Sequence, residues 1–178
     1  FSKNAVNMPR RYFFESVAVV DKAGKRTTDT IWHQVKDISF TNQNDQHVSL
    51  SEAKGKIIVL NFFFTRCPTI CPALTLNMKR LQHSFAKNDS IVQFISVSVD
   101  PESDSVPQLR NFANKFNANQ DNWWFVTGNK KDIYDFAFTE MKASIADTMW
   151  TQHLSIPKTF FCWIAAGLSV DGIMDLIR

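Results

Sequence analysis

Two cysteines stand at the junction between an apolar run and a helical pattern. The run Ile57–Phe64 is typical of a buried strand, and the spacing of apolar residues over Ala73–Leu81 predicts a helix. Cys67 and Cys71 lie between the two, so the strand brings both thiols to the first turn of the helix. The unpaired backbone N–H groups and the helix dipole at such a position favour thiolate over thiol.

The spacing of the two cysteines allows their sulfurs to meet. Residues four apart share one face of a helix, and two soft thiolates that converge can exchange a disulfide or bind a soft metal such as Cu(I). The three intervening residues suit two sulfurs pointing at one metal, and a disulfide can still close if the backbone adapts. A structural role, as two small buried residues at a helix start, is the third alternative.

The composition predicts a globular chain. Its 178 residues, 44% hydrophobic and 21% charged, are enough to bury a substantial core. The net charge of +3 is too small and too scattered to indicate nucleic-acid binding, and the basic pairs Arg10-Arg11 and Lys130-Lys131 are predicted to be solvated surface. The sequence has no apolar run as long as the roughly 18 residues that a transmembrane helix needs.

Two hairpins are predicted ahead of the cysteines. The first occupies Tyr12 to about Val35, around a turn at Gly24, and the second joins Asp37–Thr41 to His47–Leu50. Ser51–Gly55 has the pattern of a short capped turn that ends at glycine. The chain is therefore divided into an N-terminal hairpin extension, residues 1–35, and a main domain, residues 36–178.

In the main domain, strands alternate with helices. Such alternation favours an α/β fold with a largely parallel central sheet. Residues 142–157 have no strong periodicity and are the best candidate for a long functional loop. The expected strands are Ile57–Phe64, Ile91–Val99, Asn122–Val126 and Thr159–Ile164; the expected helices are Cys71 to about Phe85, one capped by Asp104 or Ser105 with Pro107 in its first turn, Asp132 to about Met141, and one that starts within Gly172–Arg178.

Two segments resemble a known family. Phe63-Phe-Thr-Arg-Cys67-Pro-Thr-Ile-Cys71-Pro72 is similar to the Phe-Thr-x-Cys-Pro-x-x-Cys-Pro signature of the Sco (SenC) copper chaperones. Ser96-Val-Ser-Val-Asp100-Pro-Glu-Ser-Asp104 is similar to the Ser-Val-Asp-Pro-x-x-Asp segment of the same family. The resemblance implies a thioredoxin-like fold, with a central mixed β-sheet flanked by helices and an N-terminal β-hairpin extension.

The resemblance also implies a copper site. Cys67 and Cys71 would be two ligands and His153, on a loop late in the chain, the third. Two thiolates and one imidazole suit Cu(I) and can also hold Cu(II). The other histidines, His33, His47 and His83, are predicted to have no part in the site, and Cys162 is expected at a core position of its strand.

The function that the resemblance implies is copper delivery to, or reduction of the cysteines of, the dinuclear copper site of a haem–copper cytochrome oxidase subunit. It further implies the periplasmic side of a membrane, with an anchor upstream of Phe1. Ile156-Pro157-Lys-Thr-Phe160 instead resembles the loop of membrane-tethered thiol–disulfide reductases, where a cis-proline packs beside the redox cysteines. A thiol–disulfide oxidoreductase is therefore one alternative. An accessory docking subunit of a respiratory complex is another.

Five positions have more than one interpretation. Asp100 and Asp104 could be acids near the metal that orient a ligand or a partner, because α/β proteins build their sites at this edge of the sheet. Alternatively, Asp100-Pro101 only ends a strand, and Asp104 or Ser105 caps the next helix. Arg66 could stabilise a thiolate, dock a partner or lie on the surface. Met149 and Trp150, which flank the ligand loop, could cover copper, contact a partner or pack under the loop.

Overall fold

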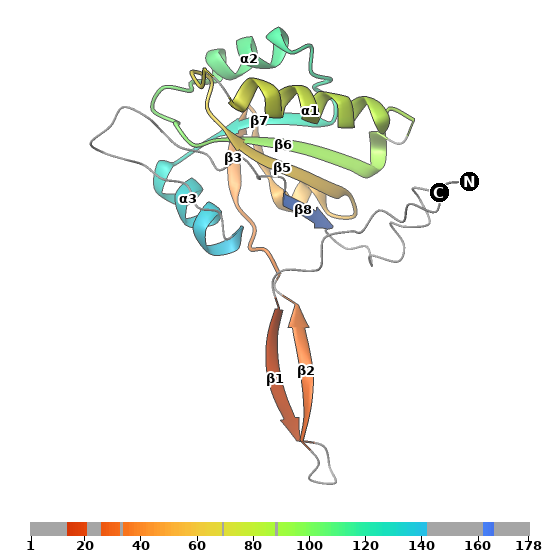
Figure 1. Cartoon of the computed structure of the whole chain (residues 1–178). Helices are drawn as coiled ribbons and strands as arrows, with labels where there is room; N and C mark the ends of the chain where they lie inside the picture. Colours follow the sequence, from red (N-terminus) through yellow and green to blue (C-terminus); the bar gives the residue numbers. More distant parts are fainter. Residues whose placement is uncertain are drawn as a thin grey trace. The chain divides into compact units, whose positions relative to one another are not determined.

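The computed structural model describes residues 14–20, 26–32, 34–68, 70–87, 89–141 and 162–165. It divides into two compact units, residues 1–36 and 37–178. In the first unit, β1 (Phe14–Val20) pairs antiparallel with β2 (Arg26–Trp32) over the whole length of both strands (Figure 1). The first predicted hairpin is therefore confirmed.

The second unit is built on a six-stranded sheet with the order β4-β3-β7-β6-β5-β8. The three central strands, β5, β6 and β7, run parallel, and the others pair antiparallel with their neighbours. The α/β class is confirmed, and the sheet is mixed, as the family resemblance implies. The strands are β3 (Ser39–Asn42), β4 (His47–Ser49), β5 (Ile57–Phe63), β6 (Val92–Ser98), β7 (Trp123–Thr127) and β8 (Cys162–Ala165).

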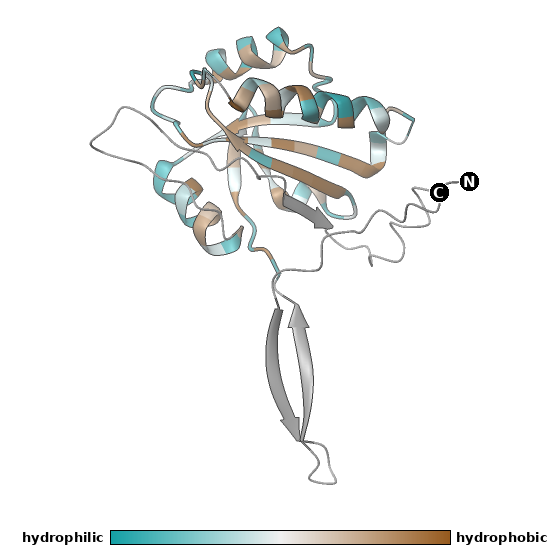
Figure 2. Ribbon diagram, in the orientation of Figure 1, coloured by the Kyte–Doolittle hydropathy of each residue, from teal (hydrophilic) through white to brown (hydrophobic). Residues whose placement is uncertain are grey.

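Two adjacent parallel strands, β5 and β6, are buried on both faces. Every residue of β5 and of β6 is buried, and Figure 2 shows both strands mainly in the brown of hydrophobic residues. Parallel strands need crossover helices, which cover both faces of the sheet and so require apolar side chains on each. α1 (Ile70–Ser84) and α2 (Val106–Lys115) cover one face, and α3 (Lys130–Asp135) lies on the other (Figure 1).

Aromatic rings fill the core on either side of the sheet. On the α2 side, Phe63 packs against Phe112 and Phe125, with ring centroids 5.0 and 5.8 Å away. On the α3 side, Phe136 contacts both Phe40 and Phe62. Adjacent residues of β5 thus serve opposite faces, because side chains alternate along a strand.

The ends of the helices differ in detail from the prediction. α3 begins two residues earlier than expected because the Asn129 side chain accepts the N–H groups of Lys131 and Asp132 at its start. Its last turn widens into a π-helical segment, η3 (Phe136–Glu140). Two short 3-10 turns, η1 (Leu50–Ala53) and η2 (Asp89–Ile91), complete the described elements.

The capping prediction for α2 is correct only in position. Ser105 is the N-cap residue, but its side chain makes no capping hydrogen bond. The Asp104 carboxylate is not a cap either, since its oxygens are taken by donors from Thr65 and Ser98. The predicted loop at 142–157 and the predicted terminal helix lie outside the described residues. None of the helices in the described part of the chain is long and apolar enough to span a membrane.

Candidate functional site

The two cysteines lie where the sequence predicts them, between β5 and α1. β5 ends at Phe63, and a turn closed by a hydrogen bond from Cys67 N to the Phe64 carbonyl at 3.2 Å leads toward α1. α1 begins at Ile70, so Cys71 lies in its first turn and Cys67 just precedes it. No disulfide joins Cys67 and Cys71.

The sulfur of Cys67 lies against the start of the helix. The backbone N–H of Cys71 donates a hydrogen bond to Cys67 Sγ at an N–S distance of 3.4 Å. A donated N–H stabilises negative charge on the sulfur that accepts it. Cys67 is 8% exposed and Cys71 is 0% exposed, so Cys67 is the more accessible of the two.

The expectation that both cysteines favour the thiolate is wrong for Cys71. Burial, followed by a hydrogen bond with Cys67, raises the pKa of Cys71 to about 12. Burial in an apolar environment disfavours the charged form, and here it outweighs the helix dipole. Cys71 therefore carries a proton at neutral pH and must release it before its sulfur can act as a ligand or a nucleophile.

This asymmetry predicts selective alkylation. At neutral pH, iodoacetamide is expected to modify Cys67 at least roughly tenfold faster than Cys71, because the reagent attacks accessible thiolate. Peptide mass spectrometry after short exposures measures the two rates, and the guanidinium-unfolded chain, in which the rates should converge, is the control. Equal rates in the folded protein would contradict this assignment.

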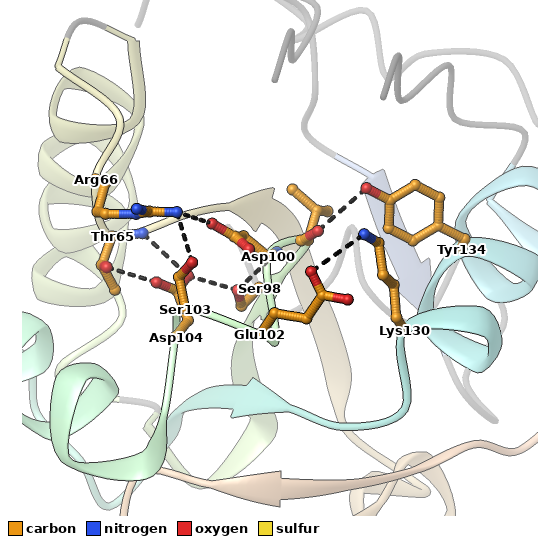
Figure 3. Close-up of polar contacts among 10 residues, drawn as sticks. Thr65, Arg66, Ser98, Asp100, Glu102, Ser103, Asp104, Lys130 and Tyr134 are labelled. Carbon is orange, nitrogen blue, oxygen red and sulfur yellow. Dashed lines mark hydrogen bonds and ion pairs between the residues drawn. The ribbon is translucent and has the colours of Figure 1, made fainter. Parts of the chain in front are cut away.

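A polar network joins the cysteine turn to the loop that follows β6 (Figure 3). Asp104, which is fully buried, accepts hydrogen bonds from the Thr65 backbone N–H at 3.0 Å and the Thr65 hydroxyl at 2.5 Å. On the outside, Arg66 pairs with Asp100 at 2.8 Å and donates to Ser103. Two adjacent residues of the turn are thus tied to one loop.

The guanidinium group of Arg66 faces the loop that follows β6. Its side chain is 69% exposed, and the hydrogen bond and the charge of Asp100 raise its pKa further. Of the three interpretations of Arg66, the geometry favours a surface residue that orders the turn through Asp100. Solvent screens such an exposed ion pair, so it contributes little to stability.

The same loop also contacts α3. Lys130 lies 3.6 Å from Glu102, and the Tyr134 hydroxyl donates to the Val99 carbonyl at 3.2 Å (Figure 3). Sequence reasoning placed Lys130 on the solvated surface and did not single out Glu102 or Tyr134. It also did not link Thr65, inside the cysteine signature, to Asp104, inside the Asp-Pro segment; the side-by-side placement of β5 and β6 was a signal that could have done so.

The remaining predicted site residues are only partly described. His47 and His83 are exposed, and His33 lies outside the described residues. Cys162 lies on β8 opposite Leu60 of β5. Within the described residues, no group of three or more His, Cys, Asp or Glu could hold a metal. His153, Met149, Trp150 and the Ile156–Pro157 bond lie outside them.

Sequence comparisons identify relatives of this chain. The SCO1 protein homolog of Bacillus subtilis (strain 168) is 38% identical over 123 residues, which cover 68% of this chain and 64% of that protein. A putative copper-binding protein of Stutzerimonas stutzeri is 30% identical over 100 residues, 56% of this chain and 48% of that protein. The chain therefore spans less than two thirds of the length of these curated relatives.

Solved structures share the fold. A SCO1/SenC family lipoprotein from Bacillus anthracis str. Ames matches with a TM-score of 0.61 at 34% identity, covering 65% of this chain and 70% of that chain. BsSco, a member of the Sco family of cytochrome c oxidase assembly proteins with a disulfide switch, matches with a TM-score of 0.57 at 40% identity, covering 62% of this chain and 65% of that chain. The thioredoxin-like fold is thereby confirmed.

The family assignment rests on more than half of the chain. The SCO1/SenC family model matches residues 27–153, a stretch that contains both cysteines, the Asp-Pro segment and His153. The chain belongs to the SCO1/SenC family.

Proposed function

We propose that this protein binds copper through Cys67 and Cys71 and serves the assembly of a haem–copper cytochrome oxidase. The observation that carries the proposal is the pair of cysteines at the strand-to-helix turn, not joined by a disulfide, with Cys67 Sγ held against the Cys71 N–H. Two relatives support it: the Stutzerimonas stutzeri protein is named as copper-binding, and BsSco belongs to a family of cytochrome c oxidase assembly proteins.

The donor set of the described residues suits Cu(I). Two sulfur ligands on one turn are soft donors, which select Cu(I) over hard cations. A copper ion would be the cargo of the site, held by Cys67, Cys71 and, as the family resemblance implies, His153. Since the pKa of Cys71 is raised to about 12, copper uptake should release a proton from that thiol. Affinity should therefore rise with pH through the neutral range.

Two routes to an assembled oxidase use the same pair of sulfurs. In delivery, thiolates of the target replace Cys67 and Cys71 as copper ligands. In reduction, Cys67 attacks a disulfide of the target to form a mixed disulfide, and one target thiol leaves. Cys71 then attacks Cys67 Sγ, which releases the second target thiol and leaves a Cys67–Cys71 disulfide, so that two electrons pass from this protein to the target.

Experiments with a soluble copper-bearing oxidase domain distinguish delivery from reduction. The Cu(I)-loaded protein is mixed with that domain in its reduced form, and the copper-free reduced protein with its disulfide form. Delivery predicts copper transfer in the first mixture, and reduction predicts two new target thiols in the second. If neither change occurs while both thiols of this protein are free, the proposed function is wrong, and an accessory docking role is favoured.

The thiol–disulfide oxidoreductase is the second candidate function. The observation that favours it is the difference in burial between the two cysteines, since Cys67 is 8% exposed and Cys71 is fully buried. An attacking cysteine and a buried resolving cysteine would have this arrangement. Reduction of unrelated disulfide substrates, at a rate independent of copper, would support it over the chaperone.

His153 distinguishes the two candidates by mutation. His153→Ala is expected to weaken Cu(I) retention about 100-fold, because one ligand of a shared site is lost, while disulfide exchange changes by less than about twofold. Competition with a Cu(I) chelator and a thiol-exchange assay measure the two quantities. His83→Ala, at an exposed position of α1, is the control. Normal copper retention in His153→Ala would remove His153 from the ligand set.

The cellular site is part of the proposal. The Bacillus anthracis relative is a lipoprotein, which supports attachment to a membrane. We place this chain on the periplasmic side, anchored upstream of Phe1, where a copper-bearing oxidase subunit would be within reach. Fractionation of cells that express the full-length protein tests this placement, and recovery in the cytosol would contradict it.

A further inference from the structure

Asp104 is a buried carboxylate next to the turn that bears the cysteines. Its exposed fraction is 0%, although the neighbouring Ser105 is exposed. Oδ2 accepts from Thr65 N at 3.0 Å and from Ser98 Oγ at 2.5 Å, and Oδ1 accepts from Thr65 Oγ1 at 2.5 Å (Figure 3). A carboxylate is costly to bury unless donors replace its water, and three donors do so here.

The partners of Asp104 differ from those of a helix cap. An aspartate at the N-cap of a helix commonly accepts the N–H groups of its first turn, and the sequence offered Asp104 for that position, but the N-cap of α2 is Ser105. Asp104 does not act as a cap: α2 has no side-chain cap at Ser105, and both carboxylate oxygens are used by Thr65 and Ser98. The carboxylate therefore ties the turn after β5 to the loop after β6 and leaves the helix start without a cap.

Thr65 is held by its main chain and its side chain at once. It lies two residues before Cys67, whose Sγ accepts the N–H of Cys71 at 3.4 Å. We propose that Asp104 is the positioning residue of this turn, holding Thr65 so that Cys67 Sγ stays against the Cys71 N–H in the reduced state that accepts copper. The inference rests on the proposed use of the two sulfurs.

The ion pair between Arg66 and Asp100 cannot replace the hydrogen bonds between Asp104 and Thr65. Arg66 and Asp100 also join the turn to the loop, but Arg66 is 69% exposed and its ion pair is screened by solvent. Asp104 itself is fully buried, as is its hydrogen bond from Ser98, and it also holds the backbone N–H of the turn itself. Placement of the sulfur should therefore depend on Asp104.

Two substitutions separate placement from charge. Asp104→Asn removes the charge but can keep the contacts, because its Oδ1 accepts from Thr65 N and Ser98 Oγ while its Nδ2 donates to Thr65 Oγ1. Asp104→Ala removes every contact. Gln43→Met is the matched structural control, since Gln43 is also fully buried and bonds Phe125 N and the Trp123 carbonyl near the opposite edge of the sheet.

The experiment measures Cu(I) affinity by chelator competition, the glutathione equilibrium of the cysteine pair, and the melting temperature. Asp104→Ala is expected to lose Cu(I) affinity at least about tenfold, as outer-shell losses do. Its pair should shift toward the disulfide about tenfold, or about 30 mV, because the reduced form loses its support. Asp104→Asn should stay within about twofold of the parent, and Gln43→Met should lower only the melting temperature.

Two results would overturn the inference. If Asp104→Ala melts early but matches the parent in copper and glutathione, the carboxylate is merely structural; if Asp104→Asn is as weak as Asp104→Ala, charge rather than placement matters. If Asp104→Ala does not fold, Thr65→Val takes its place, because it removes the hydroxyl that donates to Asp104. It is expected to weaken Cu(I) affinity and to shift the cysteine pair toward the disulfide, each by about fivefold, which corresponds to the loss of one hydrogen bond. No shift in either quantity would refute the proposal. If the unsubstituted protein does not bind Cu(I), the proposed function is wrong, and the glutathione equilibrium still tests the role of Asp104.

Discussion

A protein carrying Cys71→Ser is expected to hold Cu(I) at least roughly 100-fold more weakly than the parent. Structural zinc sites gain about 10–16 kcal/mol from four ligands, so one thiolate of such a site is worth about 3 kcal/mol, and each 1.4 kcal/mol is about tenfold in affinity. Serine has nearly the shape of cysteine but is a hard donor that Cu(I) does not favour. The effect should therefore come from the ligand and not from the fold.

Chelator competition on the reduced protein measures this loss, and Cys67→Ala should lose copper to a similar extent. Cys162→Ala is the matched control, because it also removes one of the three cysteines but lies on β8, outside the turn. Full copper retention by Cys71→Ser would exclude that sulfur as a ligand. A loss shared equally by Cys162→Ala would indicate damage to the fold.

Phe63→Ala is expected to cause the largest loss of stability among single core substitutions near the site. Phe63 is 0% exposed and packs between Phe112 and Phe125, and truncating such a ring leaves a cavity that costs about 3–5 kcal/mol. In a chain of this size, that lowers the melting temperature by about 6–20 °C. Its carbonyl also accepts the Val99 N–H at 2.9 Å, four residues before Cys67.

Thermal and urea unfolding of the reduced protein measure the change. Leu76→Ala is the control, since Leu76 is 47% exposed on α1 and its truncation should alter stability by no more than about 0.5 kcal/mol. If the melting temperatures of Phe63→Ala and Leu76→Ala differed by only about 2–3 °C, the two variants would differ in stability by about 1 kcal/mol. The proposed packing at this end of β5 would then be wrong.

The order of elements and the place of the cysteines were predictable because both depend on local pattern. Continuous apolar runs marked β5 and β6, and the step from strand to helix placed Cys67 and Cys71 correctly. The antiparallel direction of β8 was not readable from its residues, because pairing with β5 is a choice made in three dimensions. The family resemblance supplied the mixed sheet that the periodicity did not.

The chemistry of the site depended on contacts that sequence does not encode locally. Burial reverses the expected effect of the helix dipole on Cys71, and the degree of burial follows only from packing. Asp104 looked like a helix cap by position, but its partners Thr65 and Ser98 come from other strand ends. The helix-capping rule described the sequence position of Asp104, but its partners follow from the pairing of β5 and β6 in the sheet.

The most direct test of the central claim is an anaerobic Cu(I) titration of the fully reduced protein against a competing chelator. The account predicts that one equivalent is held, with an affinity that rises as the pH is raised, because the thiol of Cys71 must lose its proton. If the reduced protein fails to compete for copper although both thiols are shown to be free, the copper site at Cys67 and Cys71 does not exist.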